Sequence, residues 1–111
     1  MDENPETQSP PEVNEYPLPP ASFTFLVLSL KTQAELQMGL IHFGEEQDRP
    51  EPQFRVARHT IDLIAMLHEK TKGNLSLDEQ RLIENSLTEL RLRYVQALEA
   101  HKPKAEEQAR A

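Results

Sequence analysis

A short segment beyond the middle of the chain ends one helix and begins another. It spans residues 70–79 and reads Lys-Thr-Lys-Gly-Asn-Leu-Ser-Leu-Asp-Glu. Gly73 can adopt the left-handed conformation that ends a helix, because glycine has no Cβ to clash. Ser76 and Glu79 have the spacing of a capping box, in which each side chain binds the other residue's backbone N–H at a helix start. The segment therefore predicts two antiparallel helices joined by a structural turn that depends on Gly73, Ser76 and Glu79.

Apolar residues on both sides of this turn recur at helical spacing. They predict one helix from about Gln53 to Thr71 and another from Leu77 to about Ala100. The first of these carries two apolar stripes, which indicates a central helix with two neighbours. The second carries a seam whose spacings alternate between four and three residues, as in coiled coils. The members of this seam are Ile83, Leu87, Leu90, Tyr94 and Ala97.

A further helix is predicted nearer the N-terminus, from Ser22, which can cap it, to about Met38, just before Gly39. Its first turns are apolar on nearly all sides, which is typical of a helix that is buried all round. The alternative for residues 23–30 is a β-strand, because aromatic and branched residues are frequent there. We favour the helix, since the sequence offers no second strand to pair with. The predicted fold class is therefore all-α, a three-helix arrangement with a long C-terminal helical hairpin.

The two ends of the chain differ in composition from its middle. Residues 1–20 hold six of the nine prolines and five acidic residues, without any Lys or Arg. Such a segment cannot bury enough apolar surface to offset the entropy of ordering it. We predict a disordered acidic arm over residues 1–20, a helical domain over residues 21–101 and a disordered tail over residues 102–111, with Pro103 breaking the last helix.

Charge and composition argue against several classes of partner. The net charge is −7 and no basic stripe is present, so the chain has little with which to neutralise phosphates of a nucleic acid. An acidic surface also disfavours anionic membranes, and the longest apolar-rich run, residues 23–30, is far shorter than the ~20 residues of a membrane-spanning helix. The absence of cysteine excludes disulfides and Cys-type zinc sites. Without the features of a signal peptide, the expected location is cytoplasmic.

One set of polar residues has the spacing of a possible ligand site. His59 and Asp62 lie three residues apart in the middle helix, and Glu69 follows Asp62 by one heptad, so the three can share a face. A solvated face of an amphipathic helix is the simpler interpretation. No serine-nucleophile elbow, phosphate-binding glycine loop or dinucleotide fingerprint occurs. We therefore predict no catalytic, cofactor-binding or metal-binding residues; a metal-binding, small-ligand or enzymatic site on the His59/Asp62/Glu69 face is the alternative.

Four short segments carry a resemblance to a known family. They are Ile-Asp-Leu-Ile at 61–64, Glu-Lys-Thr-Lys-Gly-Asn-Leu at 69–75, Leu-Arg at 90–91 and Tyr-Val at 94–95. Together with Phe25, Ser29, Leu30, Gln33, Ala34, Gly39 and Leu67 they resemble an uncharacterised bacterial family defined by a domain of unknown function. The resemblance covers about residues 22–96, and the segment at 69–75 is its specific part. It implies an all-helical cytosolic protein and carries over no catalytic residues.

The first predicted helix has more apolar residues than one packing seam requires, and Ile41 and Phe43 add to them. Exposed apolar patches of this kind normally mark an interface. We therefore expect a non-enzymatic helical module that self-associates or binds an unidentified protein partner, with a two-fold homodimer as the simplest assembly. The predicted interface residues are Phe23, Phe25, Leu26, Val27, Leu28 and Leu30.

Overall fold

The computed structural model describes residues 17–110, with side chains as far as Lys102. Its elements in chain order are helix α2 (Phe23–Gln37), the 3-10 turn η2 (Glu46–Asp48), helix α3 (Phe54–Lys70) and helix α4 (Leu77–Arg110). No strand occurs within residues 17–110, so the all-α prediction is confirmed and the strand alternative for residues 23–30 is excluded. Most of the predicted acidic arm, residues 1–16, lies outside the described part of the chain.

Both ends of α2 follow the local signals in the sequence. The Ser22 side chain accepts a hydrogen bond from the backbone N–H of Phe25 at 3.0 Å, as expected of an N-cap. At the other end, Gly39 has a φ of +79°. The backbone N–H of Leu40 donates to the Glu35 carbonyl at 2.9 Å, and that of Gly39 to the Leu36 carbonyl at 3.1 Å. This is the Schellman arrangement that ends many helices with a left-handed glycine.

The turn between α3 and α4 has the predicted structure. Gly73 has a φ of +82°, in the left-handed region. The Ser76 Oγ accepts from the Glu79 backbone N–H at 3.2 Å, and the Glu79 Oε1 accepts from the Ser76 backbone N–H at 2.9 Å. These two bonds satisfy donors that the start of α4 would otherwise leave unpaired. Gly73 therefore lies in the turn that follows α3, and Ser76 and Glu79 cap the start of α4.

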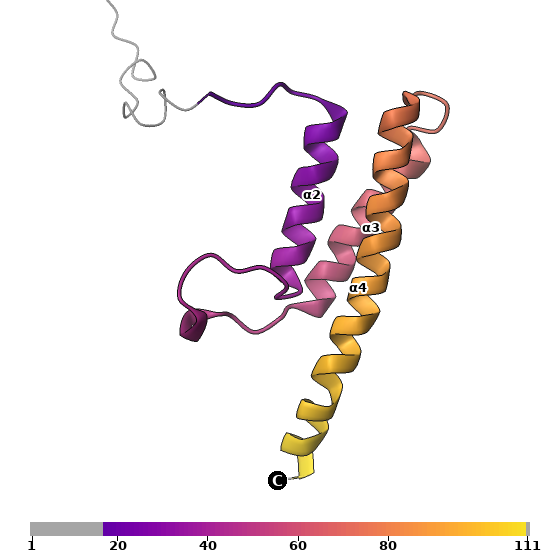
Figure 1. Ribbon diagram of the computed structural model, residues 1–111. Helices are drawn as coiled ribbons and strands as arrows, with labels where there is room; N and C mark the ends of the chain where they lie inside the picture. The colour runs from indigo at the N-terminus through magenta and orange to yellow at the C-terminus, as the bar shows by residue number, and fades with distance from the viewer. Residues whose placement is uncertain (1–16, 111) are drawn as a thin grey trace, which may run out of the picture.

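The three helices enclose one apolar core, to which α3, α4 and α2 with its C-terminal cap each contribute three buried residues. α3 packs against both α2 and α4, as predicted for a central helix, but α2 also contacts α4. The helices therefore form a triangle around the core rather than a row (Figure 1). Of the five residues of the predicted seam of α4, Ile83, Leu87 and Leu90 are buried in the core and Tyr94 packs against it. The buried apolar residues are Val27, Ala34, Met38, Ala57, Ile61, Ile64, Ile83, Leu87 and Leu90.

Polar contacts fix the register of the helices around this core. The buried Thr60 hydroxyl of α3 donates to Gln37 Oε1 of α2 at 2.7 Å. Lys31 of α2 reaches Glu89 of α4 at 3.0 Å, and Glu89 also lies 3.2 Å from Arg93 one turn further along α4. The Lys31 hydrogen bond and charge, and to a smaller extent the Arg93 charge, lower the pKa of Glu89.

The end of α4 differs from the sequence-based expectation. The helix was expected to end near Ala100 and to break at Pro103, but it runs to Arg110. A proline removes one backbone donor and disfavours a helix without forbidding it. The residues around Pro103 are mainly strong helix formers: Lys, Ala, Glu, Gln and Arg. Among the helices of residues 17–110, none is both long enough and apolar enough to cross a membrane.

Candidate functional site

The predicted interface residues of α2 fall into three environments. Val27 is fully buried in the core. Phe23 and Leu30 are half-buried and pack against that core. The other three point away from α3 and α4 and are exposed by more than two-fifths of their surface. These are Phe25, Leu26 and Leu28.

The side of α2 that faces away from the bundle carries no charge. At 100° per residue, Phe25, Ser29, Thr32 and Leu36 form a row opposite the buried Val27. All members of this side are exposed, and none is ionisable. We call this surface the outer face of α2, and it consists of Phe25, Leu26, Leu28, Ser29, Thr32, Gln33 and Leu36.

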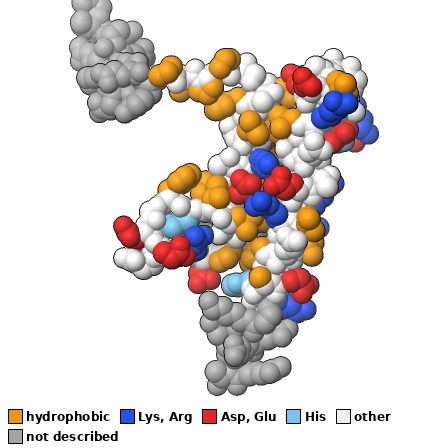
Figure 2. All heavy atoms as spheres, viewed as in Figure 1, with side chains coloured by type: hydrophobic (Ala, Val, Ile, Leu, Met, Phe, Trp, Pro, Cys, Tyr) orange, Lys and Arg blue, Asp and Glu red, His pale blue; other side chains and the backbone are white. Residues whose placement is uncertain are grey.

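The two charged residues of α2 are half-buried instead of lying on the outer face. They are Lys31 and Glu35, and Lys31 is held by Glu89 of α4. Figure 2 shows acidic and basic side chains together where α2 meets α4, and hydrophobic side chains over the segment that precedes α2. Solvent-facing sides of helices normally carry the charged residues of a protein. In α2 the charged residues are half-buried and the solvent-facing side is uncharged.

The chain segments at the two ends of α2 extend this apolar surface. In Figure 1 the segment before α2 and the loop after it both project on the side of α2 that faces away from α3 and α4. Leu18 in the first segment and Phe43 in the loop are the most exposed large apolar residues among those the structure describes, at 89% and 78%. Sequence reasoning included Phe43 in the apolar excess. It did not single out Leu18 or Leu36, because single leucines carry no signal of exposure.

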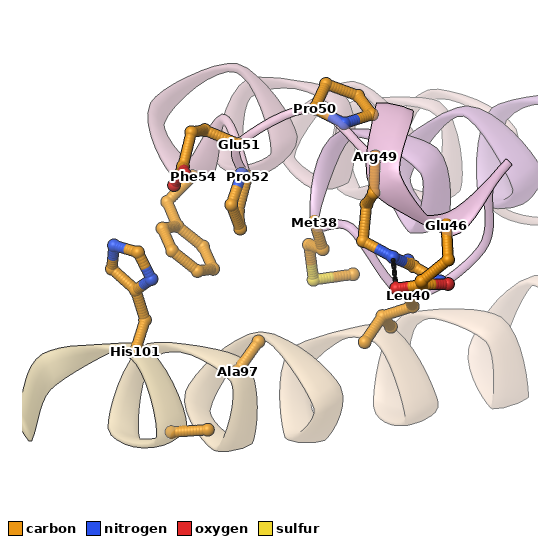
Figure 3. A pocket seen from close by; sticks show the side chains of 11 residues that line it. Met38, Leu40, Glu46, Arg49, Pro50, Glu51, Pro52, Phe54, Ala97 and His101 are labelled. Atoms are coloured by element: carbon orange, nitrogen blue, oxygen red, sulfur yellow. Dashed lines mark hydrogen bonds and ion pairs between the residues drawn. The ribbon is translucent and has the colours of Figure 1, made fainter. Parts of the chain in front are cut away.

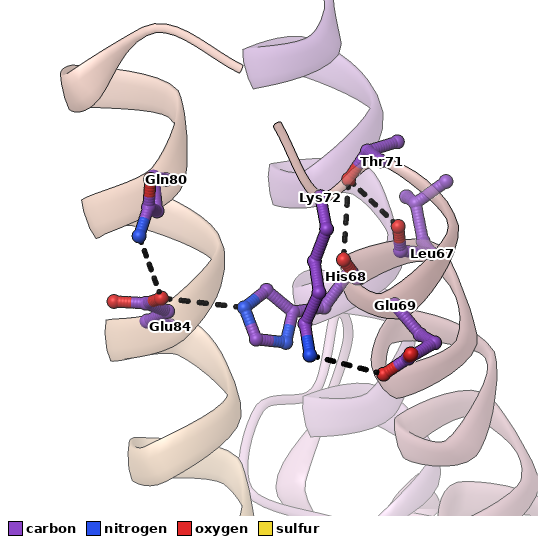
Figure 4. Close-up of polar contacts among 7 residues, drawn as sticks. All are labelled: Leu67, His68, Glu69, Thr71, Lys72, Gln80 and Glu84. Carbon is purple, nitrogen blue, oxygen red and sulfur yellow. Dashed lines mark hydrogen bonds and ion pairs between the residues drawn. The ribbon is translucent and has the colours of Figure 1, made fainter. Parts of the chain in front are cut away.

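A cluster of polar residues surrounds the turn between α3 and α4 (Figure 4). His68 Nε2 of α3 lies 3.3 Å from Glu84 Oε2 of α4, and the Gln80 amide donates to the same oxygen at 3.2 Å. Lys72 pairs with Glu69 at 3.4 Å. His68, Lys72 and Glu84 also line a cavity of about 380 Å³ beside the turn. The His68–Glu84 contact joins α3 to α4, whereas the Lys72–Glu69 pair is local to the end of α3, so these side chains already have partners within the hairpin.

The His59/Asp62/Glu69 face is exposed at all three residues. His59 and Asp62 line one shallow cavity together with Arg55 and other residues of the first half of α3, and Glu69 is not part of it. Glu69 pairs with Lys72 instead. Within the part of the chain that the structure describes, no group of three or more His, Asp or Glu side chains is arranged to hold a metal ion.

The loop after α2 forms a groove with the distal part of α4 (Figure 3). Arg49 fixes the loop, because its guanidinium donates to Glu46 at 2.8 and 3.1 Å and to the Gly39 carbonyl at 2.7 Å. The Arg49–Glu46 bonds lower the pKa of the Glu46 carboxyl and raise that of Arg49. Phe54 lines the groove and lies against His101, with 5.4 Å between ring centroids. No local signal in the sequence indicates this anchoring by Arg49.

The groove has a volume of about 640 Å³ and is open to solvent. Phe54 also packs edge-on against Tyr94, at 6.1 Å between centroids and an interplanar angle of 82°. The groove therefore sits over an aromatic contact that joins α3 to α4. Of the three Glu and Arg residues that line it, Glu46 and Arg49 are paired with each other, which leaves these two little capacity to bind a charged ligand, and Glu51 is the third.

Comparison with known proteins identifies a family for most of the chain. Residues 20–96 match the model of a family described as a domain of unknown function, DUF1844. The matched range contains the whole outer face of α2 and the hairpin turn, whereas the α4 wall of the groove, Ala97, Ala100 and His101, lies beyond it. Neither the curated proteins nor the solved structures gave a match. Because the match spans α2, α3 and the first half of α4, the chain belongs to the DUF1844 family.

Proposed function

We propose that this chain is a non-enzymatic protein-interaction module of the cytoplasm, and that it binds its partner through the outer face of α2. One observation carries the proposal. This surface is exposed, largely apolar and free of charge, although it belongs to a chain with a net charge of −7. Contact with another protein would remove its apolar area from water, at roughly 25 cal/mol for each Å².

Other exposed apolar residues of the chain are set among charges. Met66 on α3 is 47% exposed, and its helical neighbours Asp62, Glu69 and Lys70 are exposed as well. Scattered apolar residues of this kind are normal on protein surfaces. The outer face of α2 differs because Phe25, Leu28 and Leu36 follow one another along a helix without an interrupting charge. An uncharged centre is also the compositional signature of the buried part of protein interfaces.

The same charge balance disfavours a nucleic acid as the partner. Affinity for nucleic acids comes largely from Lys and Arg that neutralise phosphates, and the outer face has none to offer. The ligand-binding or enzymatic alternative would use His59, Asp62 and Glu69. Glu69 is engaged by Lys72, and His59 and Asp62 alone supply two ligands on an open helix surface.

Site-specific photo-crosslinking tests this function and captures a partner of any identity. A benzophenone amino acid replaces Phe25 in one variant and Met66 in a matched control, because both native side chains are 47% exposed. Irradiation of cells that produce the protein is expected to give protein adducts from position 25 and few from position 66. Equal labelling at the two positions, or no adduct from position 25, would show that the outer face of α2 is not an interaction surface.

A further inference from the structure

We infer that the outer face of α2 binds a second copy of this chain, with the two α2 helices antiparallel and a two-fold axis passing between the levels of Ser29 and Thr32. The inference rests on the proposed function, because it names the partner of that same surface. It goes further by fixing the orientation of the two copies and the residues that meet at the axis.

The sizes of the side chains along the outer face suit a copy of the same helix. Its central row is Phe25, Ser29, Thr32 and Leu36, with spacings of four, three and four residues, as in the seam of a coiled coil. Two large residues therefore lie at the ends and two small ones in the middle. When an antiparallel copy is centred on this row, Ser29 lies beside Thr32 of the second copy, and Phe25 faces Leu36 of the second copy at both ends. Ser29 and Thr32 are small and allow the two helix backbones to approach closely at the centre. The same pair, Phe25 with Leu36 of the second copy, fills the space at each end.

One of the two hydroxyl groups at the centre of this row, that of Ser29, already has a partner. The Ser29 hydroxyl donates to the Phe25 carbonyl of its own helix at 2.8 Å. Burial of a hydroxyl is costly when its hydrogen bond is lost and much less costly when the bond is kept. Ser29 can therefore be covered by another helix without leaving an unsatisfied donor.

The lack of charge on the outer face of α2 favours contact between identical chains. Each copy carries a net charge of −7, of which −5 comes from residues 1–20, so two copies repel each other overall. A two-fold contact also places each surface against itself, which brings any charge at its centre close to a like charge. The outer face of α2 has no charge to oppose in this way, because Lys31, which is held by Glu89, and Glu35 are both half-buried and lie outside it. The antiparallel orientation further places the positive end of each helix dipole beside the negative end of the other.

The contact area sets the expected strength. The 15 residues of α2 extend about 22 Å, so a single pair of such helices gives an interface below the ~800 Å² per partner of stable complexes. Leu18 and Phe43 lie beyond the two ends of α2. In the antiparallel arrangement, the end of one copy that carries Leu18 meets the end of the other that carries Phe43, which enlarges the contact. We therefore expect a dissociation constant on the order of 1–100 μM.

Sedimentation equilibrium of the full chain tests the self-association. We expect a monomer–dimer equilibrium that Leu36→Glu weakens at least about tenfold, because the variant places a charge in the apolar seam. Met66→Glu adds the same charge on an exposed site of α3 and is expected to leave the dimer unchanged. A chain that stays monomeric at about 1 mM would overturn the inference. So would equal weakening by the two variants, with circular dichroism confirming that both are folded.

Thiol crosslinking tests the orientation, and the lack of native cysteine makes it unambiguous. Phe25→Cys and Leu36→Cys are prepared separately, mixed and treated with a short bismaleimide. The antiparallel pair brings position 25 of one chain to position 36 of the other, while like positions stand about 16 Å apart along the axis. We expect the mixed product to exceed both like products several-fold. Predominance of the like products would indicate parallel helices and overturn the inference.

The identity of the photo-adduct at position 25 separates this inference from the function on which it rests. An adduct with the mass of two copies of this chain supports both. An adduct formed only with a different protein overturns the homodimer and leaves the outer face of α2 as an interaction surface. Absence of any adduct at position 25 would contradict the proposed function as well as the homodimer.

Discussion

Gly73 is expected to stabilise the hairpin through its backbone conformation alone. It has a φ of +82°, and a Cβ built at this position meets no atom within 4 Å. Gly73→Ala therefore introduces no steric contact and carries only the strain of a left-handed non-glycine residue, about 1–2 kcal/mol. For a domain of this size, each kcal/mol lowers the Tm by about 4–8 °C.

Gly39 provides a matched comparison. Its φ of +79° is nearly the same, but a Cβ there lies 3.3 Å from Pro52 Cγ. Gly39→Ala thus adds a tight contact to the same backbone strain and is expected to be the more destabilising of the two. Gly73→Asn should recover much of the loss at position 73, since asparagine tolerates the left-handed region better than other residues.

Thermal and urea unfolding of the four proteins, followed by circular dichroism, give the free energies of unfolding. The expected order of stability is wild type, Gly73→Asn, Gly73→Ala and Gly39→Ala. A Gly73→Ala protein as stable as wild type would refute the argument from backbone conformation. A Gly73→Ala protein less stable than Gly39→Ala would refute the assignment of open space around Gly73.

Three further changes follow from contacts in the structure. Ser76→Ala removes the N-cap of α4 and should cost ~1 kcal/mol of unfolding free energy, measured by urea denaturation. Thr60→Val leaves Gln37 without its buried donor and should cost about 1–2 kcal/mol in the same measurement. The hydrogen bond and charge of Lys31 lower the pKa of Glu89 in the folded state. The stability that this pair contributes is therefore fully present above the unfolded pKa of 4.5, and it is lost as the pH falls through the lower folded pKa. Glu89→Gln should therefore reduce the decrease in stability between about pH 5 and 3.

The controls use exposed positions on the same helices. Thr88→Val on α4 changes the same atoms as Thr60→Val at an exposed site and should be nearly neutral. Glu99→Gln removes an exposed carboxylate of α4 and should leave the acid dependence close to that of wild type. Equal effects of Thr60→Val and Thr88→Val would contradict the role of the Gln37 hydrogen bond. An unchanged pH profile for Glu89→Gln would contradict the pairing with Lys31, whose effect is modest because the Glu89 side chain is 41% exposed.

Local chemistry made much of this fold predictable from its sequence. Ser22, Gly39, Gly73 and the capping box at Ser76 act within five residues along the chain, so their roles can be inferred without tertiary structure. The starts of α2 and α4 were placed within one residue by these signals, and the start of α3 was placed equally closely by apolar periodicity. The end of α4 was not, because a proline rule that holds on average was applied to a segment rich in helix formers.

The side of α2 that is exposed was harder to infer. Val27 and Leu28 are adjacent and similar in character, yet one is fully buried and the other is 42% exposed. Periodicity assigns a core face only when the opposite face is polar, and in α2 apolar residues occur on both. The anchoring of the loop by Arg49 was equally hidden, because it depends on the approach of the Gly39 carbonyl ten residues away. The predicted homodimer stays a prediction. It should be tested at exposed residues such as Phe25 and Leu36 and not at the buried Val27.

The arrangement of α2 separates its contribution to stability from its proposed contribution to binding. Val27 and Ala34 face the core, while Phe25 and Leu36 lie on the outer face, where they contact solvent. Substitution of Val27 by a charged residue would unfold the monomer and could not distinguish a lost partner from a lost fold. Substitutions on the outer face remove no core contact, so the free energy of unfolding at high dilution should hardly change. The outer face is expected to affect stability only at concentrations where the dimer forms, because association stabilises the folded state by mass action. Dependence of the Tm on protein concentration in wild type, and its absence in Leu36→Glu, would therefore connect the surplus apolar surface of α2 to association.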